Sequence, residues 1–240
     1  MADLVFRRKE QKYRLNAGQT EAFRQAMAEF MEHDRYATSA IRNIYYDTPD
    51  FLLIRRSLMK PTVYKEKLRL RSYGDATADS KVFLEMKKKY KGIVYKRRIR
   101  LRTAKAQAYM ADPEAKLEDS QIGREIDYFK KFYGSLFPAL FLSYDRESWR
   151  SHDGQLRITM DWNIQYRIEE VDLTKPAYGT QLLEPGEHLL EIKSPGAMPL
   201  WLVEVLSKNK IVPSSYSKYG AAYTRLLKEH KIESRGCHYV

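Results

Sequence analysis

Charged residues alternate with apolar residues along several segments of the chain. Lys67, Arg69 and Arg71 occupy every second position of one segment, with leucines between them. Because successive side chains of a β-strand point to opposite faces, this segment predicts a strand with one apolar and one cationic face. The same alternation recurs at residues 81–87, 94–102, 156–161 and 189–193. The pattern therefore predicts several strands of this two-faced kind.

The whole pattern predicts a mixture of strands and helices. Strands are expected at residues 6–15, 41–46, 62–72, 81–88, 93–102, 139–149, 156–166 and 188–194. Helices are expected at residues 20–33, 105–111, 123–132, 199–208 and 216–230, with a short helix or turn at 50–57. Consecutive long strands, with helices between them and at the end, favour an α+β fold whose antiparallel sheet curls or closes. No linker interrupts the pattern, so residues 1–240 are expected to form a single domain.

Composition narrows the class of partner. The chain is 43% hydrophobic, which is ordinary for a globular protein, and its formal net charge is +12. That excess favours an anionic partner, which is nucleic acid, a phosphate compound or a membrane surface. Cys237 is the single cysteine, which excludes a disulfide within the chain and a Cys-rich zinc site. Neither a signal peptide nor an apolar run of the ~20 residues that span a bilayer is visible, so a cytoplasmic protein is expected.

The repeated cationic faces favour an enclosed site over a solvated surface. For a single strand, a polar face in water is the simpler interpretation. Here arginine dominates the charged faces, carboxylates recur singly among the cations, and helices are available to cover the apolar faces. A barrel of about eight strands can hold a small ligand, and cations buried inside it would be costly without an anion. A polyphosphate chain, which arginine binds through paired hydrogen bonds, meets this requirement.

Three glutamates each precede a lysine by two residues and share its predicted strand face. They are Glu10, Glu85 and Glu191, paired with Lys12, Lys87 and Lys193. Carboxylate and phosphate oxygens together suit hard cations such as Mg²⁺ and Mn²⁺. The alternative is that these glutamates neutralise neighbouring arginines. Both interpretations stay open for Glu10 and Glu85, whereas we favour a metal at Glu191.

Short motifs occur in a recognisable order between residues 6 and 228. They are RKEQKY at 8–13, YYDTPDF at 45–51, KLRLRSYG at 67–74, FLEMK at 83–87, KRR at 96–98, YDR at 144–146, RITMD at 157–161, LEIK at 190–193 and YSKY at 216–219. In this order they resemble the triphosphate tunnel metalloenzymes. Within that superfamily the chain is similar to the polyphosphate polymerase domain of the vacuolar transporter chaperone (VTC) type.

The resemblance implies a closed, eight-stranded antiparallel β-barrel, with helices packed outside it and at the C-terminus. The basic tunnel inside would bind a triphosphate or polyphosphate, and a divalent cation, Mn²⁺ or Mg²⁺, would assist phosphoryl transfer. Asp47, in the Tyr-Asp motif, is expected to be structural. The resemblance assigns Lys12, Arg69, Arg71, Arg157 and Lys193 to catalysis. It assigns Lys87, Lys96, Arg98, Tyr144, Arg146, Ser217 and Lys218 to phosphate binding and Glu191 to the metal, with Glu10 and Glu85 as the further candidate metal ligands.

The expected reaction is transfer of the ATP γ-phosphate to a growing polyphosphate chain with release of ADP. The expected partners are ATP, triphosphate and inorganic polyphosphate, without nucleic acid or a membrane segment. Two departures keep hydrolysis of tripolyphosphate or nucleoside triphosphates open. The loop at 213–216 lacks a lysine that the eukaryotic polymerases have, and Glu10 is typical of the broader superfamily, which contains hydrolases.

A non-catalytic module that binds polyphosphate or nucleic acid is the third interpretation. Its support is the abundance of tyrosine, at 18 residues, because aromatic rings can stack on bases. The chain contains neither the GxxxxGK[ST] nor the GxGxxG motif, which disfavours ordinary P-loop and Rossmann nucleotide binding.

Overall fold

A computed structural model describes residues 9–59, 61 and 63–232. Residues 6–8 of the first expected strand, Thr62 and Cys237 lie outside the described residues. The chain forms two compact units. Unit 1 comprises Met1–Ala40, Tyr144–Ile164 and Gln181–Ser217, and unit 2 comprises Ile41–Ser143, Gln165–Thr180 and Lys218–Val240. The expectation of a single domain over residues 1–240 stays a prediction.

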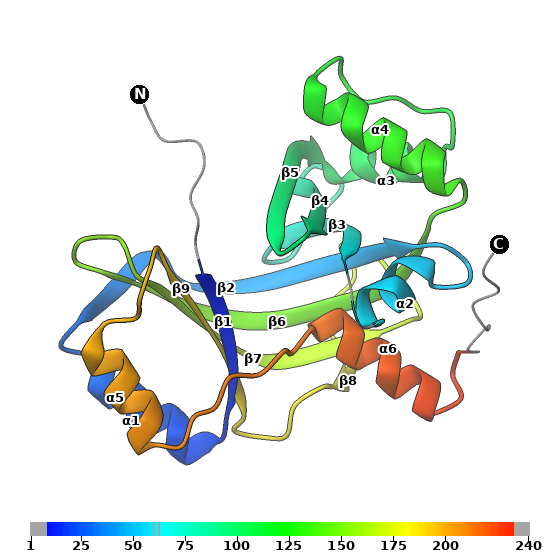
Figure 1. Ribbon diagram of the computed structural model, residues 1–240. Helices are drawn as coiled ribbons and strands as arrows, with labels where there is room; N and C mark the ends of the chain where they lie inside the picture. Colours follow the sequence, from blue (N-terminus) through cyan, green and yellow to red (C-terminus); the bar gives the residue numbers. More distant parts are fainter. Residues whose placement is uncertain (1–8, 60, 62, 233–240) are drawn as a thin grey trace. The chain divides into compact units, whose positions relative to one another are not determined.

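The described strands form a nine-stranded sheet in the order β1-β9-β7-β6-β2-β3-β4-β5, with β8 paired to β7 (Figure 1). The strands are β1 Lys9–Leu15, β2 Met31–Asp47, β3 Tyr64–Tyr73, β4 Lys81–Tyr90, β5 Ile93–Arg102, β6 Phe137–Ser151, β7 Arg157–Arg167, β8 Thr180–Gln181 and β9 His188–Ser194. The helices are α1 Ala17–Met27, α2 Leu52–Leu58, α3 Thr103–Ala111, α4 Gln121–Tyr133, α5 Leu200–Lys208 and α6 Lys218–Lys228. None of these helices offers an apolar stretch long enough to cross a membrane.

The structure confirms the α+β class and the antiparallel pairing, but it does not support the closed eight-stranded barrel. Among the described residues, the hydrogen-bonded order ends at β1 on one side and at β5 on the other. Alternation along a strand sets which of its faces is charged. It contains no signal for whether two edge strands hydrogen-bond to each other, so closure was not readable from the pattern.

The first helix is shorter than the sequence pattern predicts. α1 ends at Met27, and Met31 already belongs to β2, so the expectation of helix up to residue 33 is wrong. Phe30 stacks on Trp201 of α5 with ring centroids 4.6 Å apart, and Met31 is buried in the core of unit 1. These two apolar residues therefore reflect packing in the turn and in the strand, not another turn of helix.

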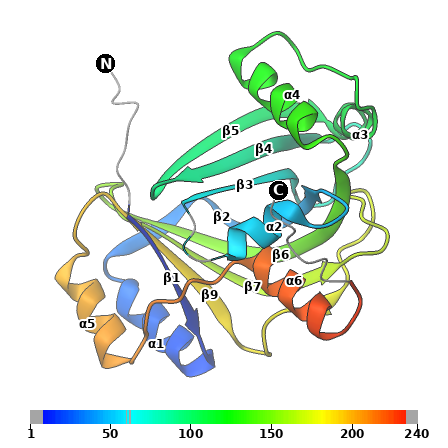
Figure 2. The same cartoon turned by 45° about the vertical axis from the view of Figure 1, so that its right-hand side comes forward.

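The apolar core of unit 2 lies between the strands β3 to β5 and the helices α3 and α4 (Figure 2). Leu68, Leu70 and Leu84 are fully buried on the apolar strand faces, as the alternation predicts. Ala106 of α3 and Ile126 of α4 belong to the same core. Because these faces are covered by helices, the cationic side chains of the same strands are on the opposite face.

Unit 1 has its own apolar core, which α1 and α5 share with β1, β7 and β9. Asn16 starts α1 through a capping box, in which its side chain accepts from the Gln19 backbone and Gln19 reaches back to the Asn16 backbone. Phe23 of α1 and Leu202 of α5 are buried in this core. α1 and α5 lie side by side in Figure 1. The core fixes β9 so that its charged residues share the other face.

Candidate functional site

Unit 2 presents a cationic face on β3, β4 and β5. The antiparallel register aligns side chains across these strands in rows: Lys67, Lys87 and Lys96 form one row, and Arg69, Glu85 and Arg98 form the next. Directly opposite residues on one face have Cβ atoms roughly 5 Å apart, and like charges at that separation repel. An anion bound over the lysine row would remove this repulsion.

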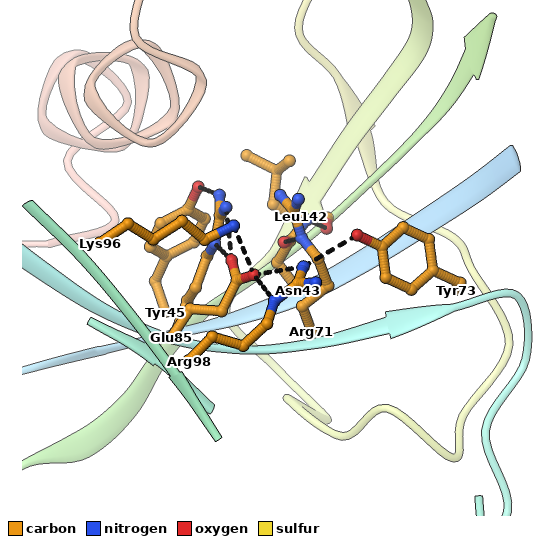
Figure 3. A network of polar contacts seen from close by, with 9 residues as sticks. Asn43, Tyr45, Arg71, Tyr73, Glu85, Lys96, Arg98 and Leu142 are labelled. Atoms are coloured by element: carbon orange, nitrogen blue, oxygen red, sulfur yellow. Dashed lines mark hydrogen bonds and ion pairs between the residues drawn. The ribbon is translucent and has the colours of Figure 1, made fainter. Parts of the chain in front are cut away.

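The Glu85 carboxylate holds three cationic side chains together (Figure 3). Its Oε2 accepts from Arg69 Nε at 2.8 Å, and its Oε1 accepts from Arg98 Nε at 2.6 Å. Lys96 Nζ lies 2.9 Å from Oε1. Burial alone would raise the pKa of Glu85, but Arg69, Arg71 and Lys96 outweigh burial and hold this pKa well below its usual range. Glu85 is therefore ionised and orients the cations around it.

One carboxylate does not neutralise three cations. Burial lowers the pKa of Lys96, Glu85 raises it, and the nearby Arg98 and Arg69 lower it again, so that the net direction is down. Burial is the largest of these effects, and repulsion from the two arginines adds to it, while the count of charges is three cations to one carboxylate. This face of unit 2 therefore has an excess of positive charge, which suits the oxygens of a phosphate group.

Two polar residues of β2 belong to this face, although the sequence analysis gave them no role. Asn43 Oδ1 accepts from Arg71 Nε at 2.8 Å, and Asn43 Nδ2 donates to the carbonyl oxygen of Leu142 at 3.0 Å (Figure 3). The buried Asn43 thereby fixes the guanidinium of Arg71. The available sequence signal was their spacing, since Asn43 and Tyr45 are two residues apart on one strand.

Tyr45 is the second of these residues, and its hydroxyl accepts from Arg69 Nη1 at 3.4 Å. Burial alone would raise the pKa of the Tyr45 phenol. Arg69, Lys67 and Arg71 outweigh burial and lower this pKa to about 8. The Tyr45 ring also stacks on Tyr219 of α6, with centroids 4.6 Å apart.

Within unit 2, Tyr219 connects the start of α6 to the end of β2. Its hydroxyl donates to Asp47 Oδ2 at 2.9 Å, and Asp47 also accepts backbone N–H groups of Thr48, Leu53 and Ile54. Lys218, one of the predicted phosphate ligands, is the first residue of this helix. The buried Asp47 thus accepts hydrogen bonds from backbone N–H groups and from the Tyr219 hydroxyl, which agrees with the structural role expected for it.

Unit 1 gathers a second charged cluster on β1 and β9. Lys12 Nζ lies 3.5 Å from Glu191 Oε2 and 3.4 Å from Glu10 Oε1, so two carboxylates approach one ammonium group. Lys193 Nζ pairs with the other oxygen of Glu191. Burial opposes the charge of Lys12, but Glu191 and Glu10 outweigh burial and raise its pKa.

Glu191 is ionised in this cluster. Burial alone would raise its pKa, but Lys193 and Lys12 outweigh burial and hold the pKa of Glu191 well below its usual range. In the register, Glu191 lies opposite Lys12 on one side and Thr159 of β7 on the other. The carboxylate is therefore the centre of the charged face of unit 1.

The remaining predicted cations of unit 1 are held by aspartates. Arg146 donates to both oxygens of the buried Asp161, from Nε at 2.5 Å and from Nη2 at 2.8 Å. Arg157 Nη2 lies 2.7 Å from Asp34 Oδ2. The guanidinium of Arg146 also lies over the ring of Tyr144, 5.3 Å from its centroid. These pairs orient the two arginines before any ligand binds.

A family model of the VTC domain matches residues 7–227, nearly the whole chain. The chain belongs to the VTC domain family. This match confirms the resemblance that the ordered motifs indicated. No curated protein matches the sequence.

Two solved structures share the fold of this VTC domain. One is a Hippeastrum protein described as a candidate adenylyl cyclase with a dominant triphosphatase activity. It is 20% identical with a TM-score of 0.55, and the match covers 93% of this chain and 96% of that one. The other is a candidate adenylate cyclase from Bacillus halodurans, 13% identical with a TM-score of 0.55, covering 87% of this chain and 92% of that one. At these identities the likeness concerns the fold.

The predicted site residues of the VTC domain thus fall into two groups. Unit 2 brings together Arg69, Arg71, Lys87, Lys96, Arg98 and Glu85 on neighbouring strands, with Lys218 at the start of α6. Unit 1 brings together Lys12, Lys193, Glu191 and Glu10, and it also contains Tyr144, Arg146, Arg157 and Ser217.

The two groups differ in how well they suit a divalent cation. Among the described residues, no three His, Cys, Asp or Glu side chains gather as a metal site. Mg²⁺ is commonly bound by one or two carboxylates together with substrate phosphates and water. Glu10 and Glu191 provide two such carboxylates around Lys12, whereas the oxygens of Glu85 are taken by three cations. The donor set of unit 1 therefore fits a hard cation, and the contacts of Glu85 favour the alternative role of neutralising arginines.

Proposed function

We propose that this VTC domain transfers the γ-phosphate of ATP to the end of an inorganic polyphosphate chain and releases ADP. The observation that supports this most directly is the family match over residues 7–227. A second supporting observation is that three cations surround Glu85, more than one carboxylate can neutralise. In the reaction, the bond between the γ-phosphorus and its bridging oxygen breaks, and a bond to a terminal oxygen of the acceptor forms.

In this proposal the protein contributes position and charge. Phosphoryl transfer needs little covalent chemistry from a protein, because the transferring group passes through a state with charge spread over its oxygens. Arg69, Arg71 and Arg98 would hold phosphate oxygens through their guanidinium groups, which Glu85 and Asn43 keep oriented. Beside these arginines, Lys87 and Lys96 would neutralise negative charge on the phosphate groups. In unit 1, Lys12, Lys193 and Arg157 would neutralise phosphate charge in the same way.

A divalent cation, Mn²⁺ or Mg²⁺, would be held by Glu10 and Glu191. When bound, such an ion neutralises developing charge on phosphate oxygens. Lys12 and Lys193 keep the Glu191 carboxylate ionised, since they hold its pKa below the usual range. An ionised carboxylate has about four lone-pair sites, so contact with two lysines leaves sites for a cation.

Hydrolysis of a triphosphate is the second candidate function. The Hippeastrum protein that shares the fold is described as having a dominant triphosphatase activity. The same binding groups would serve, with water in place of the phosphate acceptor. The difference between the two reactions concerns the acceptor alone, which the cationic faces do not select.

Incubation with ATP and Mn²⁺ separates these functions. Synthesis predicts ADP in equal amount to the phosphate found in chains that a polyphosphatase degrades, as seen on a gel. Free phosphate without chains would establish the triphosphatase instead. Tight binding of polyphosphate without any release of ADP or phosphate would mean that the protein is a binding module.

A further inference from the structure

Thr159, the third residue of β7, has a buried side chain with an unsatisfied hydroxyl. The residue is 3% exposed, and its Oγ1 has no hydrogen-bond partner among the described residues. A buried hydroxyl without a partner costs free energy, because it has given up its bonds to water. Such a group is either an unsatisfied polar atom in the core or an atom that forms its bond when a ligand binds.

The position of Thr159 favours a ligand. Its register partner on β9 is Glu191, and side chains directly opposite on one face have Cβ atoms roughly 5 Å apart. Thr159 shares its strand face with Arg157 and Asp161, not with the buried Ile158 and Met160. The hydroxyl therefore belongs to the charged face of unit 1, beside its central carboxylate.

The neighbouring polar groups already have partners. Arg157 pairs with Asp34, and Asp161 accepts both hydrogen bonds from Arg146. Glu191 is in contact with Lys12 and Lys193. On this face the charged side chains around Thr159 are paired with one another, whereas the Thr159 hydroxyl has no hydrogen-bond partner among the described residues.

We propose that Thr159 Oγ1 is a further oxygen ligand of the divalent cation that Glu191 and Glu10 hold. The proposal rests on the metal dependence in the proposed function. Two carboxylates and one hydroxyl, with phosphate oxygens or water, make up a set of oxygens that Mg²⁺ and Mn²⁺ accept. The hydroxyl would gain its missing partner when the cation binds, and it would restrict the cation to the β7 side of Glu191.

The test is Mn²⁺ binding to the full chain without nucleotide, measured by isothermal titration calorimetry. Thr159→Val keeps the shape and removes the hydroxyl, and we expect it to weaken Mn²⁺ binding about tenfold, by analogy with other ligand-shell losses. Thr159→Ser keeps the hydroxyl and should stay within about twofold of the wild type. In urea without metal, Thr159→Val should unfold at an unchanged or higher concentration, because an unsatisfied group has been removed.

Thr20→Val is the matched control in the same unit. Thr20 is also buried, but its Oγ1 donates to the Asn16 carbonyl at 2.8 Å. This variant should unfold at lower urea and bind Mn²⁺ like the wild type, which is the reverse of Thr159→Val.

Two results would overturn the proposal. One is unchanged Mn²⁺ affinity in Thr159→Val, and the other is a loss of stability in that variant without metal, which would make the hydroxyl structural. The readout is independent of turnover. If Mn²⁺ binding depends on Thr159 while no ADP or phosphate is formed, the proposed function fails and the ligand assignment stands.

Discussion

Glu85 in unit 2 and Glu191 in unit 1 share the same local sequence pattern but have different neighbours in the folded chain. Each glutamate precedes a lysine by two residues on a strand. Glu85 has a side chain 2% exposed and is in contact with Arg69, Lys96 and Arg98. Glu191 is 16% exposed and is in contact with two lysines, one of which also approaches Glu10.

The difference shows that neighbours across the sheet decide what a carboxylate does. In unit 2, three cations surround one carboxylate, so the net charge there is positive and favours binding of an anion. In unit 1, two carboxylates beside two lysines are close to balance, and their oxygens can accept a cation. We therefore propose that Glu85 orients the arginines and that Glu191 binds the metal.

The largest expected effect is on stability, from Glu85→Gln. This change removes a buried carboxylate from three cations whose side chains are 23%, 47% and 35% exposed, so it should lower the free energy of unfolding by about 2–3 kcal/mol, less than for a fully buried pair. Glu191→Gln should lower it by about 1 kcal/mol or less, because the Glu191 side chain is more exposed than that of Glu85 and contacts two cations in place of three. Urea denaturation at pH 7 measures both, and equal losses in the two variants would contradict the comparison.

The pH dependence of stability follows from the same pair. The folded state holds the pKa of Glu85 well below its ordinary value of 4.5. This stabilisation is complete above the ordinary pKa and is lost as the pH falls towards the folded-state pKa. Wild-type stability should therefore fall below about pH 4.5 more steeply than that of Glu85→Gln.

The second effect is on anion binding, from Arg69→Ala. Loss of a guanidinium that donates to phosphate should weaken tripolyphosphate binding about 50-fold, since hydrogen bonds to charged groups contribute roughly 1.5–3 kcal/mol. Arg69→Lys should lie between this variant and the wild type, because lysine keeps the charge and loses the fork. The exposed Arg124 of α4 provides the control, and Arg124→Ala should bind normally in the same titration. Binding by Arg69→Ala at wild-type strength would remove Arg69 from the site.

A smaller effect is expected from the lysine row. Lys87→Gln removes the middle charge between Lys67 and Lys96. The free energy of unfolding should rise by about 0.5 kcal/mol as repulsion across the strands falls. Tripolyphosphate affinity should drop about fivefold, with a weaker dependence on salt. Lys131→Gln on α4 is the control, and a loss of stability in Lys87→Gln would refute the repulsion.

The smallest effect concerns the pH dependence of anion binding through Tyr45. Its pKa of about 8 means that the phenol becomes negative between pH 7 and 9, beside Arg69, Lys67 and Arg71. A negative phenolate competes with phosphate, so tripolyphosphate affinity should fall about threefold over this interval. Tyr45→Phe should show a flatter profile. Identical profiles for the two proteins would exclude Tyr45 as the titrating group.

Much of the arrangement within each strand was predictable from the sequence, because a period of two is a local property. Leu68 and Leu70 are buried and Arg69 lies on the charged face, as the alternation predicts. Closure of the sheet was not predictable, since pairing of edges depends on contacts between distant segments. The apolar pattern predicts too long a first helix because Phe30 and Met31 fit a helical stripe as well as they fit a turn and a strand.

The site was readable as a set of residue types but not as a set of partners. The motifs named Glu10, Glu85 and Glu191 together, and the register alone separates Glu85, between arginines, from Glu191, between Lys12 and Thr159. Thr159 and Asn43 escaped notice because neither carries a charge. Their importance comes from burial and hydrogen bonding, which no single-strand pattern contains.

The most direct test of the different roles of the two carboxylates is Mn²⁺ binding to the Glu191→Gln and Glu85→Gln variants. Binding is measured by electron paramagnetic resonance, as the loss of the signal of free Mn²⁺. The measurement uses a Glu85→Gln sample that circular dichroism shows to be folded. We predict that Glu191→Gln loses Mn²⁺ binding and that Glu85→Gln binds Mn²⁺ like the wild type. Loss of binding in Glu85→Gln together with normal binding in Glu191→Gln would contradict the account.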